Sequence, residues 1–343
     1  MSERKGPRRA FVVLSRTTRA ALSPEHLTKL REAWDGEVEL LDRSSGESRL
    51  RGIARLVRKA GRYDAVVLDG SAGARKGYMD QVAAAIIGRR PRGPEIVFAD
   101  CQWQRGRNWL DRLACWTGIR IVDTDHVIYC VLSAEEVGIF PRTWGVGPDR
   151  VSFTPWPYVL RDEELADVPE GEGVFAGGDS LRDYGPLVAA AGEVPGEITI
   201  ATRQSDLGDG DRPANLRIVA VSHGEFVELM RKAAVVVVPL VPTRERSAGQ
   251  TTYVNAMALG KLVVVTDCLG VRSYVRDRET GLVVPPGDAH ALADALRWAV
   301  DPANRAEVGE IRARAREIAR SRLDPDEYVA NLLRIAGRRV SAR

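Results

Sequence analysis

Cysteines and long apolar runs are both scarce in this sequence. Four cysteines lie far apart and form no Cys-x-x-Cys pair, which argues against a disulfide framework and against a structural zinc site. No apolar run approaches the roughly 18 to 20 residues that a membrane-spanning helix needs, and the N-terminal segment lacks the apolar stretch of a signal peptide. We therefore expect a cytosolic protein without a metal site. The cysteines are Cys101, Cys115, Cys130 and Cys268.

Charge is nearly balanced over the whole chain, but its two halves differ. Residues 1–160 hold 26 Lys and Arg against 19 Asp and Glu, whereas the other 183 residues hold 24 against 28. The second half therefore cannot attract an anion by bulk charge and needs a few placed arginines and backbone dipoles to do so. The basic first half favours an acidic or membrane-borne partner. No recognised nucleic-acid-binding module accompanies it, so we expect no nucleic acid partner.

Short β-branched runs alternate with amphipathic segments along all 343 residues. This alternation predicts an α/β fold with two doubly wound, Rossmann-like parallel sheets, and the length suits two domains. The predicted strands of the first half are 10–15, 63–69, 95–100 and 126–133, with helices at 24–34, 48–61, 78–88 and 107–117. Those of the second half are 173–178, 197–203, 216–221, 234–241, 261–267 and 281–286, with helices at 182–193, 223–233, 250–259, 288–300, 302–320 and 325–337.

Prolines, glycines and an acidic run in residues 153–173 interrupt the alternation and predict a linker. We expect an N-terminal acceptor-binding domain at 1–158, a C-terminal donor-binding domain at 159–324 and a C-terminal helix at 325–343 that packs back on the first domain. Ligands of open α/β sheets bind beyond the carboxyl ends of the strands. Two such domains facing across a cleft would place the active site in that cleft.

The segment VFAGGDSLRDYGPLVAAA (174–191) places two glycines at the end of a predicted strand. Gly177 and Gly178 would let a phosphate approach the backbone. Arg182, at the expected start of the next helix, would donate a charge-assisted hydrogen bond to a diphosphate. A plain tight turn beside a solvated arginine is the alternative, because glycine pairs are common in turns.

The segment RERSAGQTTYVNAMALGKLVVVTD (244–267) predicts a second anion site. Its helix begins near Gly249, Gln250, Thr251 and Thr252, where small residues and hydroxyls would expose backbone N–H groups to a phosphate. Asn255 lies one helical turn further along, within reach of a ribose. A helix capped by Ser or Thr, with no ligand, is the alternative.

The segment TGLVVPPGD (280–288) is structural when taken alone, since Gly281 suits a turn and Asp288 caps the following helix. In order and spacing, however, the three segments resemble the donor-binding domain of retaining glycosyltransferases of the GT-B fold. The resemblance is to glycosyltransferase family four (glycosyl transferases group 1) in particular. NAMALGK and VPPGD are its specific parts, and the passage 127–157 is similar to the end of the family's first domain.

The resemblance implies a site for a nucleoside-diphosphate sugar, with departures at two positions. Ser247 and Asn255 stand where the family has two glutamates. Asn255 is implied to hydrogen-bond the ribose through its amide. The position of Ser247 is implied to help orient the donor sugar, and Glu245, two residues earlier, is the alternative for that role.

The remaining implied contacts come from both halves of the chain. Arg182 matches one member of the family's basic pair, and Arg203 or Arg244 would supply the other charge. His223 stands where the family binds the nucleotide base, with a helix cap as the alternative. In the first half, Asp100 is implied to face the donor sugar, with an exposed loop carboxylate or helix cap as the alternative. The expected catalytic residues are Asp100, Arg182, Glu245 and Ser247.

Residues 89–116 join several arginines with three tryptophans. Trp109, Leu113 and Trp116 recur at i, i+4 and i+7, which places them on one face of a helix. An apolar stripe facing inward, with a solvated basic face, is the commonest form of such a helix. Contact with an anionic membrane or a lipid-linked acceptor is the alternative.

Together these features predict a cytosolic glycosyltransferase of polysaccharide or glycoconjugate biosynthesis. It would transfer a hexose-like sugar from a nucleoside diphosphate with retention of configuration and without a metal or other cofactor. Arg182 and the N–H groups at 249–252 would stabilise the leaving diphosphate. A lipid-linked or acidic acceptor, with peripheral contact at the inner membrane face, stays open. So do a non-catalytic nucleotide-sugar-binding partner, a membrane-binding scaffold, and a nucleotide-sugar epimerase, which would need more histidines and carboxylates than the sequence offers.

Overall fold

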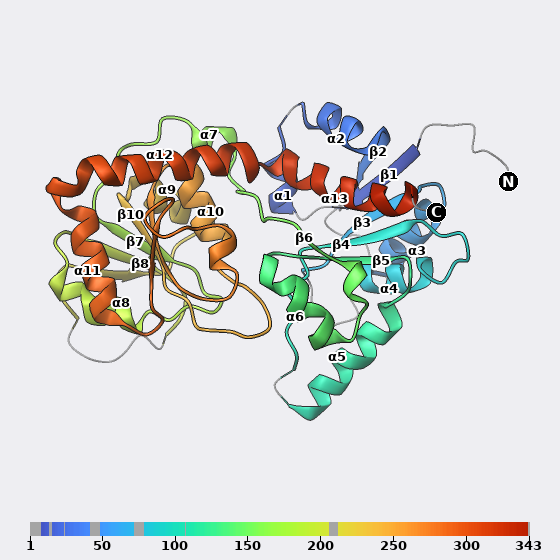
Figure 1. Ribbon diagram of the computed structural model, residues 1–343, viewed down its shortest axis with the longest axis horizontal. Coiled ribbons are helices and arrows are strands. Elements are labelled where there is room, and N and C mark those ends of the chain that lie inside the picture. The colour runs from blue at the N-terminus through green and yellow to red at the C-terminus, as the bar shows by residue number, and fades with distance from the viewer. Residues whose placement is uncertain are drawn as a thin grey trace. The chain divides into compact units, whose positions relative to one another are not determined.

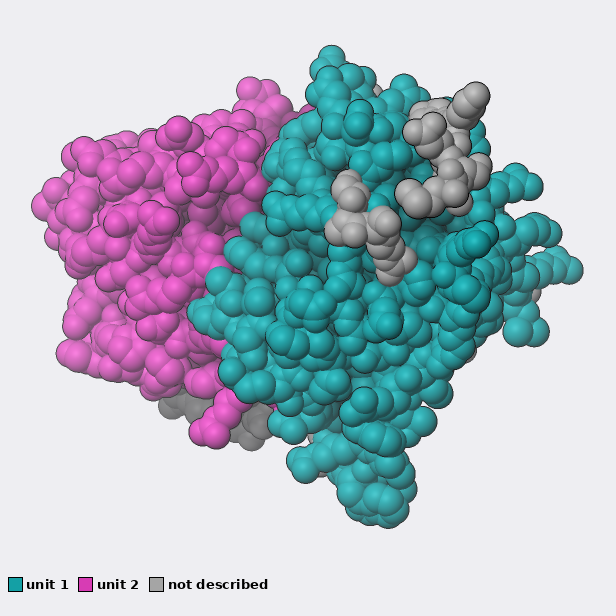
Figure 2. Space-filling model, turned by 45° about the vertical axis from the view of Figure 1, so that its right-hand side comes forward, with its two compact units in different colours: residues 1–155, 325–343 teal, residues 156–324 magenta. Residues whose placement is uncertain are grey.

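The structure, a computed structural model, describes residues 8–13, 16–23, 25–41, 49–71, 79–106, 108–205 and 212–341. The chain divides into two compact units (Figure 2). Unit 1 comprises residues 1–155 and 325–343, and unit 2 comprises residues 156–324. Each unit contains one six-stranded parallel sheet, which confirms the predicted α/β fold class. Positions 14, 15, 24, 48, 78 and 107, at the ends of predicted elements, lie outside the described residues.

The sheet of unit 1 has the strand order β2-β1-β3-β4-β5-β6, and all neighbouring strands are parallel. Every residue of β4 and β5 is buried, because a parallel sheet is covered by helices on both faces. This burial accounts for their continuous apolar runs. The strands are β1 (Arg8–Val13), β2 (Gly36–Leu41), β3 (Ala65–Asp69), β4 (Glu95–Ala99), β5 (Val127–Val131) and β6 (Val151–Phe153).

The last helix of the chain, α13, belongs to unit 1, where it packs on α2 and against β3 and β4 (Figure 1). Its apolar side chains Val329, Leu332 and Leu333 are fully buried there. The helices of unit 1 are α1 (Arg16–Ala20), α2 (His26–Trp34), α3 (Arg49–Ala60), α4 (Met79–Ile87), α5 (Trp109–Val122), α6 (Ala134–Trp144) and α13 (Pro325–Ser341).

The sheet of unit 2 has the strand order β12-β11-β10-β7-β8-β9, again with parallel neighbours. This is the dinucleotide-binding order, in which the direction of strand addition reverses between β7 and β10. The strands are β7 (Val174–Gly177), β8 (Ile198–Ala201), β9 (Leu216–Val219), β10 (Val235–Val238), β11 (Leu262–Thr266) and β12 (Leu282–Val284). The helices are α7 (Asp162–Leu165), α8 (Gly185–Ala190), α9 (His223–Lys232), α10 (Gln250–Ala258), α11 (Ala289–Val300) and α12 (Arg305–Arg322).

Two strands of unit 1 were not predicted from the sequence. β2 (GEVELL) carries two charged residues, Glu37 and Glu39, because it lies at the sheet edge and pairs with β1 alone. β6 has only three residues, which is too short for a periodic signal. Within the described residues, no helix has both the length and the apolarity needed to cross a membrane.

Candidate functional site

A pocket of about 450 Å³ opens at the carboxyl ends of the unit 2 strands. It lies at the reversal point of the strand order, where the segments that follow β7 and β10 meet in an isolated antiparallel bridge between Arg182 and Leu240. Ligands of doubly wound sheets bind at this place in the fold. The lining residues are Gly178, Asp179, Ala201, Thr202, Arg203, Val221, Ser222, His223, Phe226, Val227, Thr251, Thr252 and Asn255.

Six residues proposed from the sequence line this pocket together: Gly178, Arg203, His223, Thr251, Thr252 and Asn255. Sequence reasoning missed Asp179, Thr202 and Phe226. Thr202 directly follows β8 and Asp179 lies two residues after the end of β7, so their position at a strand end was a usable signal. Phe226 carries no such signal, because its place in the pocket depends on how α9 packs.

Arg182 does not line the pocket but lies directly behind one of its walls. Its guanidinium donates from Nε to the Gly177 carbonyl (3.2 Å), from Nη1 to the Ser180 carbonyl (2.8 Å) and from Nη2 to the Thr252 hydroxyl (3.0 Å). The residue is only 9% exposed. In the described part of the chain no carboxylate forms an ion pair with it. Burial lowers the pKa of Arg182, but a guanidinium stays protonated in proteins, so a cation with neutral partners results.

The expectation that Arg182 opens a helix is wrong. The helix α8 begins at Gly185, and Arg182 belongs to the preceding loop, where Leu181 has a positive φ of 53°. The bridge to Leu240 and the bond to Thr252 hold this loop against the segments that follow β10. Arg182 therefore joins two loops that are far apart in the sequence.

The helix α10 begins beside this arginine. Gly249 immediately precedes it with a φ of 89°, and its carbonyl accepts hydrogen bonds from the N–H groups of Thr252 (2.9 Å) and Tyr253 (3.1 Å). The first N–H groups of an α-helix have no partner within the helix, and its N-terminus favours anions. Gln250 and Ser247 are buried and hydrogen-bonded to each other, Gln250 Nε2 donating to Ser247 Oγ.

Asn255 presents hydrogen-bond donors to the pocket. Its Oδ1 accepts the backbone N–H of Val159 at 2.9 Å, and this donor fixes the orientation of the amide. The Nδ2 group is then the part left for a ligand. A glutamate at this position would instead offer a carboxylate, which can only accept.

Arg203 reaches the pocket already paired with a carboxylate. Its Nε donates to Asp179 Oδ2 at 2.9 Å and its backbone N–H to Asp179 Oδ1 at 2.7 Å. The Thr202 hydroxyl donates to the same Oδ1 at 2.8 Å. The Arg203 backbone bond, followed by those from Thr202 and the Arg203 side chain, holds the pKa of Asp179 below its usual value. Arg203 is therefore a weaker source of positive potential than Arg182.

His223 is the first residue of α9, but it does not cap that helix. The Ser222 hydroxyl accepts the Glu225 N–H, and the Glu225 carboxylate accepts the Ser222 N–H, which forms a capping box. The exposed His223 ring is thus left to the pocket rim. Phe226, one turn later, packs edge-on against Phe175, with ring centroids 5.1 Å apart.

Close packing behind this ring requires a glycine at the end of β7. A Cβ added to Gly177 would lie 2.3 Å from the Phe226 ring, which real side chains do not allow. Gly177 is therefore explained by the packing of β7 against α9. Gly178, the next residue, has a φ of 109° and lines the pocket itself.

In unit 1, Asp100 follows β4 directly and is buried, with a positive φ of 56°. Gln102 Nε2 donates to its Oδ1 at 2.7 Å. It is neither an exposed loop carboxylate nor a cap of α5, which begins at Trp109 after the N-cap Asn108. A non-glycine residue in this conformation is strained, and such strain gathers at functional sites. In unit 2, Glu245 is half-buried in the loop before α10.

The chemistry of the unit 2 pocket is that of an anion site. Its hydroxyls, its amide donors and the start of α10 lie next to one buried cation. Among the described residues, no group of three or more His, Cys, Asp or Glu side chains is placed to hold a metal ion. The arrangement can bind and stabilise a phosphate group through hydrogen bonds and positive potential.

Comparison with known proteins gives the class of this chain. Residues 201–301 match the family described as glycosyl transferases group 1. No curated protein sequence matches the chain. It is similar in structure to a glycosyltransferase from Rickettsia africae, with 12% identity, a TM-score of 0.63 and coverage of 98% of this chain and 99% of that one.

Two further solved structures are similar over nearly their whole length. Sucrose-phosphate synthase from Thermosynechococcus elongatus has 17% identity and a TM-score of 0.60, with coverage of 98% of this chain and 99% of that one. HepE from Anabaena, solved with UDP-glucose, has 14% identity and a TM-score of 0.59, with coverage of 98% and 100%.

At these identities the structural likeness establishes the fold, which is GT-B. The family match, which spans the pocket residues from Ala201 to Asn255, establishes the class of enzyme. The chain is a glycosyltransferase. The resemblance to glycosyl transferases group 1, inferred from three sequence segments, is thereby confirmed.

Proposed function

We propose that the unit 2 pocket binds a nucleoside-diphosphate sugar, and that the enzyme transfers the sugar with retention and without a metal ion. One observation carries this proposal. The buried guanidinium of Arg182 has only neutral partners and bonds Thr252 in the first turn of α10. A buried cation without a counter-ion is costly unless an anion comes close to it. A diphosphate next to Thr251 and Thr252 would be that anion.

The same groups would favour the transition state of transfer. Negative charge grows on the diphosphate as the bond to the sugar breaks, and fixed dipoles and cations at that point lower the barrier. The α10 N-terminus and Arg182 are both held by the fold before the ligand arrives. Neither must reorganise, so their effect on the developing charge is larger than that of mobile surface arginines.

The rest of the pocket suits the other parts of such a donor. The Asn255 amide would donate to a ribose hydroxyl oxygen, which accepts as well as donates. The half-buried Phe226 ring and the exposed His223 ring offer flat surfaces for a nucleobase. The similar structure of HepE from Anabaena was solved in complex with UDP and with UDP-glucose, which supports this class of ligand.

We assign the acceptor to unit 1, and we favour an acidic or lipid-linked one. Unit 1 holds 30 Lys and Arg against 21 Asp and Glu, whereas unit 2 holds 20 against 26. Such a field would attract an anionic acceptor over distances of about the Debye length. Asp100, buried and strained at the end of β4, is the unit 1 group to which we assign a role in the reaction.

A second candidate function is a nucleotide-sugar-binding partner without transferase activity. It is favoured by Ser247, which occupies the family's first glutamate position but is 1% exposed and bonded to Gln250. In this conformation the buried Ser247 side chain cannot contact a sugar without moving. Glu245 is the one acidic residue of the loop at 241–249 and would have to replace it.

Titration calorimetry with UDP-, GDP-, ADP- and TDP-glucose tests the proposal. We expect one nucleotide to bind clearly more tightly than the others. Failure of all four to bind would overturn the donor site. Slow hydrolysis of the bound donor, with NMR showing that the first-formed sugar keeps its anomeric configuration, would support a retaining enzyme. Tight binding without hydrolysis or transfer would favour the partner function.

A further inference from the structure

The helix α5 turns a stripe of large apolar side chains to the outside of unit 1. Trp109 is 71% exposed, Leu113 51% and Trp116 55%, so the expected inward orientation of this stripe is wrong. Trp103, earlier in the same segment, is the tryptophan that enters the core. Figure 1 shows the first turns of α5 extending away from the sheet of unit 1. The described residues therefore leave these three side chains more than half exposed.

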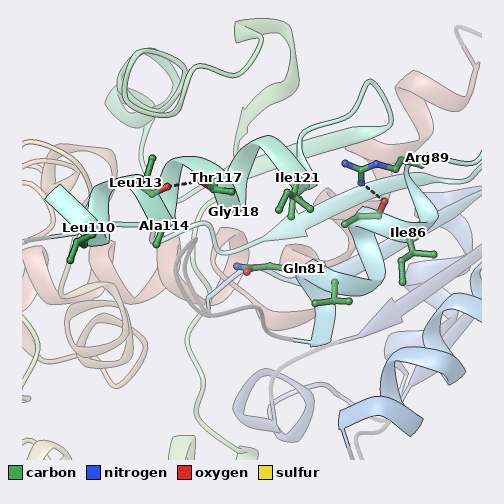
Figure 3. Close-up of a pocket in the computed structure, with 12 residues that line it drawn as sticks. Gln81, Ile86, Arg89, Leu110, Leu113, Ala114, Thr117, Gly118 and Ile121 are labelled. Atoms are coloured by element: carbon green, nitrogen blue, oxygen red, sulfur yellow. Dashed lines mark hydrogen bonds between the residues drawn. The ribbon is translucent and has the colours of Figure 1, made fainter. Parts of the chain in front are cut away.

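An apolar groove of about 920 Å³ runs beside this stripe, between α4 and α5 (Figure 3). Its polar atoms are largely satisfied within the protein. The Thr117 hydroxyl donates to the Leu113 carbonyl at 2.9 Å, and Arg89 Nη1 donates to the Ala85 carbonyl at 2.6 Å. The groove therefore offers a mostly apolar lining. That lining is Gln81, Val82, Ala85, Ile86, Arg89, Leu110, Leu113, Ala114, Thr117, Gly118, Ile121 and Val122.

Three exposed arginines lie on or next to the helices that form the apolar surface. Arg89 lies at the groove, Arg112 lies next to Leu113 on α5, and the Arg120 guanidinium lies 5.5 Å from the Trp116 ring centroid. On α5 itself Asp111 is the one acidic residue. The whole of unit 1 carries nine more basic than acidic side chains. An apolar strip with a cationic border is the pattern of surfaces that lie on anionic bilayers.

We propose that this face of unit 1, made of α5 and the α4–α5 groove, docks on an anionic lipid bilayer. Trp109 and Trp116 would lie at the level of the headgroups, where tryptophan is favoured. The arginines would contact lipid phosphates, and one acyl chain would occupy the groove. A second copy of the chain fits less well, because two arginine-bordered faces of the same net charge would repel each other.

Vesicle flotation of the full chain tests this docking directly. We expect the wild type to float with vesicles of phosphatidylglycerol and phosphatidylcholine and not with phosphatidylcholine alone. High salt should weaken the binding, because it screens the contacts between arginines and phosphates. Tryptophan emission should shift to shorter wavelength only with the anionic vesicles, since two exposed indoles would leave water.

Substitutions on α5 test whether this helix forms the vesicle-binding surface. The triple substitution Trp109→Ser, Leu113→Ser, Trp116→Ser should reduce the vesicle partition coefficient at least tenfold. Arg112→Glu with Arg120→Glu should reduce binding to anionic vesicles to a similar degree. Leu50→Ser is the matched control, because Leu50 is an 81% exposed leucine on α3, and it should bind as the wild type does. Circular dichroism and thermal unfolding check that each variant is folded, because the substituted residues belong to unit 1 and not to the unit that holds the donor pocket.

Three results would overturn the docking surface. They are no flotation of the wild type with anionic vesicles, equal flotation of the triple variant, and a wild-type dimer in light scattering that the triple variant abolishes. None of them depends on the donor site, which shares no residue with this face. Loss of vesicle binding with intact donor affinity is therefore distinct from failure of the proposed function.

Discussion

The guanidinium of Arg182 donates to the hydroxyl of Thr252 at 3.0 Å, across 70 positions of sequence. This bond ties the loop after β7 to the first turn of α10, at the reversal point of the unit 2 sheet. It also fixes a cation next to a helix N-terminus. The positive potential at this point thus comes from Arg182 and the α10 N-terminus, although unit 2 as a whole is net acidic.

Replacement of Arg182 by Met should weaken donor binding about 10- to 100-fold, because it removes the buried cation behind the pocket wall and its charged bond to Thr252, and a hydrogen bond of a charged group contributes roughly 1.5 to 3 kcal/mol. Calorimetry with the preferred nucleotide sugar measures the effect. The control is Arg203→Met, which removes an exposed ion pair with Asp179 that is worth about 0 to 1 kcal/mol. A larger loss of affinity for Arg203→Met than for Arg182→Met would show that the wrong arginine has been assigned.

Asn255→Leu should lower the free energy of unfolding by about 1 to 3 kcal/mol, because the buried Val159 N–H would lose its acceptor. Donor affinity should fall as well, since the amide donors are gone. Denaturant unfolding and calorimetry separate the two effects. Asn331→Leu on α13, where the amide bonds only the surface side chain of Arg334, should change stability by less than about 0.5 kcal/mol. Equal effects of both substitutions would argue against the Val159 bond.

Gly249→Ala should destabilise the protein by about 1 to 3 kcal/mol, the usual cost of a strained backbone. Gly249 has a φ of 89°, and an added Cβ would lie 3.1 Å from both Leu240 and Val238. Gly309→Ala on α12 is the opposite case, because nothing lies within 4 Å of its added Cβ. It should stabilise the helix by about 0.5 to 1 kcal/mol. Unfolding midpoints of both variants test this, and a neutral Gly249→Ala would refute it.

Lys261→Met should show a pH-dependent difference in stability from the wild type. Burial lowers the pKa of Lys261 to about 8 from a usual 10.5, while its Nζ donates to the Pro169 carbonyl at 2.7 Å. Between these two pH values the unfolded chain holds a proton that the folded chain has released. The wild type should therefore gain stability over the variant as pH rises from 8 to 10.5, by at most about 3 kcal/mol.

Below pH 8 both states of Lys261 are protonated, so the difference between wild type and variant should be constant there. Lys232→Met, at the exposed end of α9, is the control for removal of a surface lysine. Stability curves of the three proteins from pH 7 to 10.5 check the sign. A wild type that loses stability relative to Lys261→Met over this range would contradict the direction of the shift.

Most elements of the fold could be predicted because their signals are local. β10 and β11 consist almost entirely of β-branched residues, and the apolar positions of α9 and α11 recur with helical spacing. β2 was not predicted because an edge strand is half solvated, and its sequence therefore contains charged residues. The stripe on α5 was misjudged for a related reason. Spacing shows that three apolar residues share a face, but not what that face contacts.

The sequence by itself determined the α/β class, the family resemblance and most residues of the donor pocket, because periodicity and motif spacing are properties of neighbouring residues. Only the tertiary structure decided what those residues do there. Tertiary packing surrounds the buried Arg182 guanidinium with neutral groups and pairs Arg203 with Asp179. The bond from the Val159 N–H fixes the orientation of the Asn255 amide. The side chains of Trp109 and Trp116 stay exposed. Burial and pairing join segments that are distant along the chain, so no local pattern contains them.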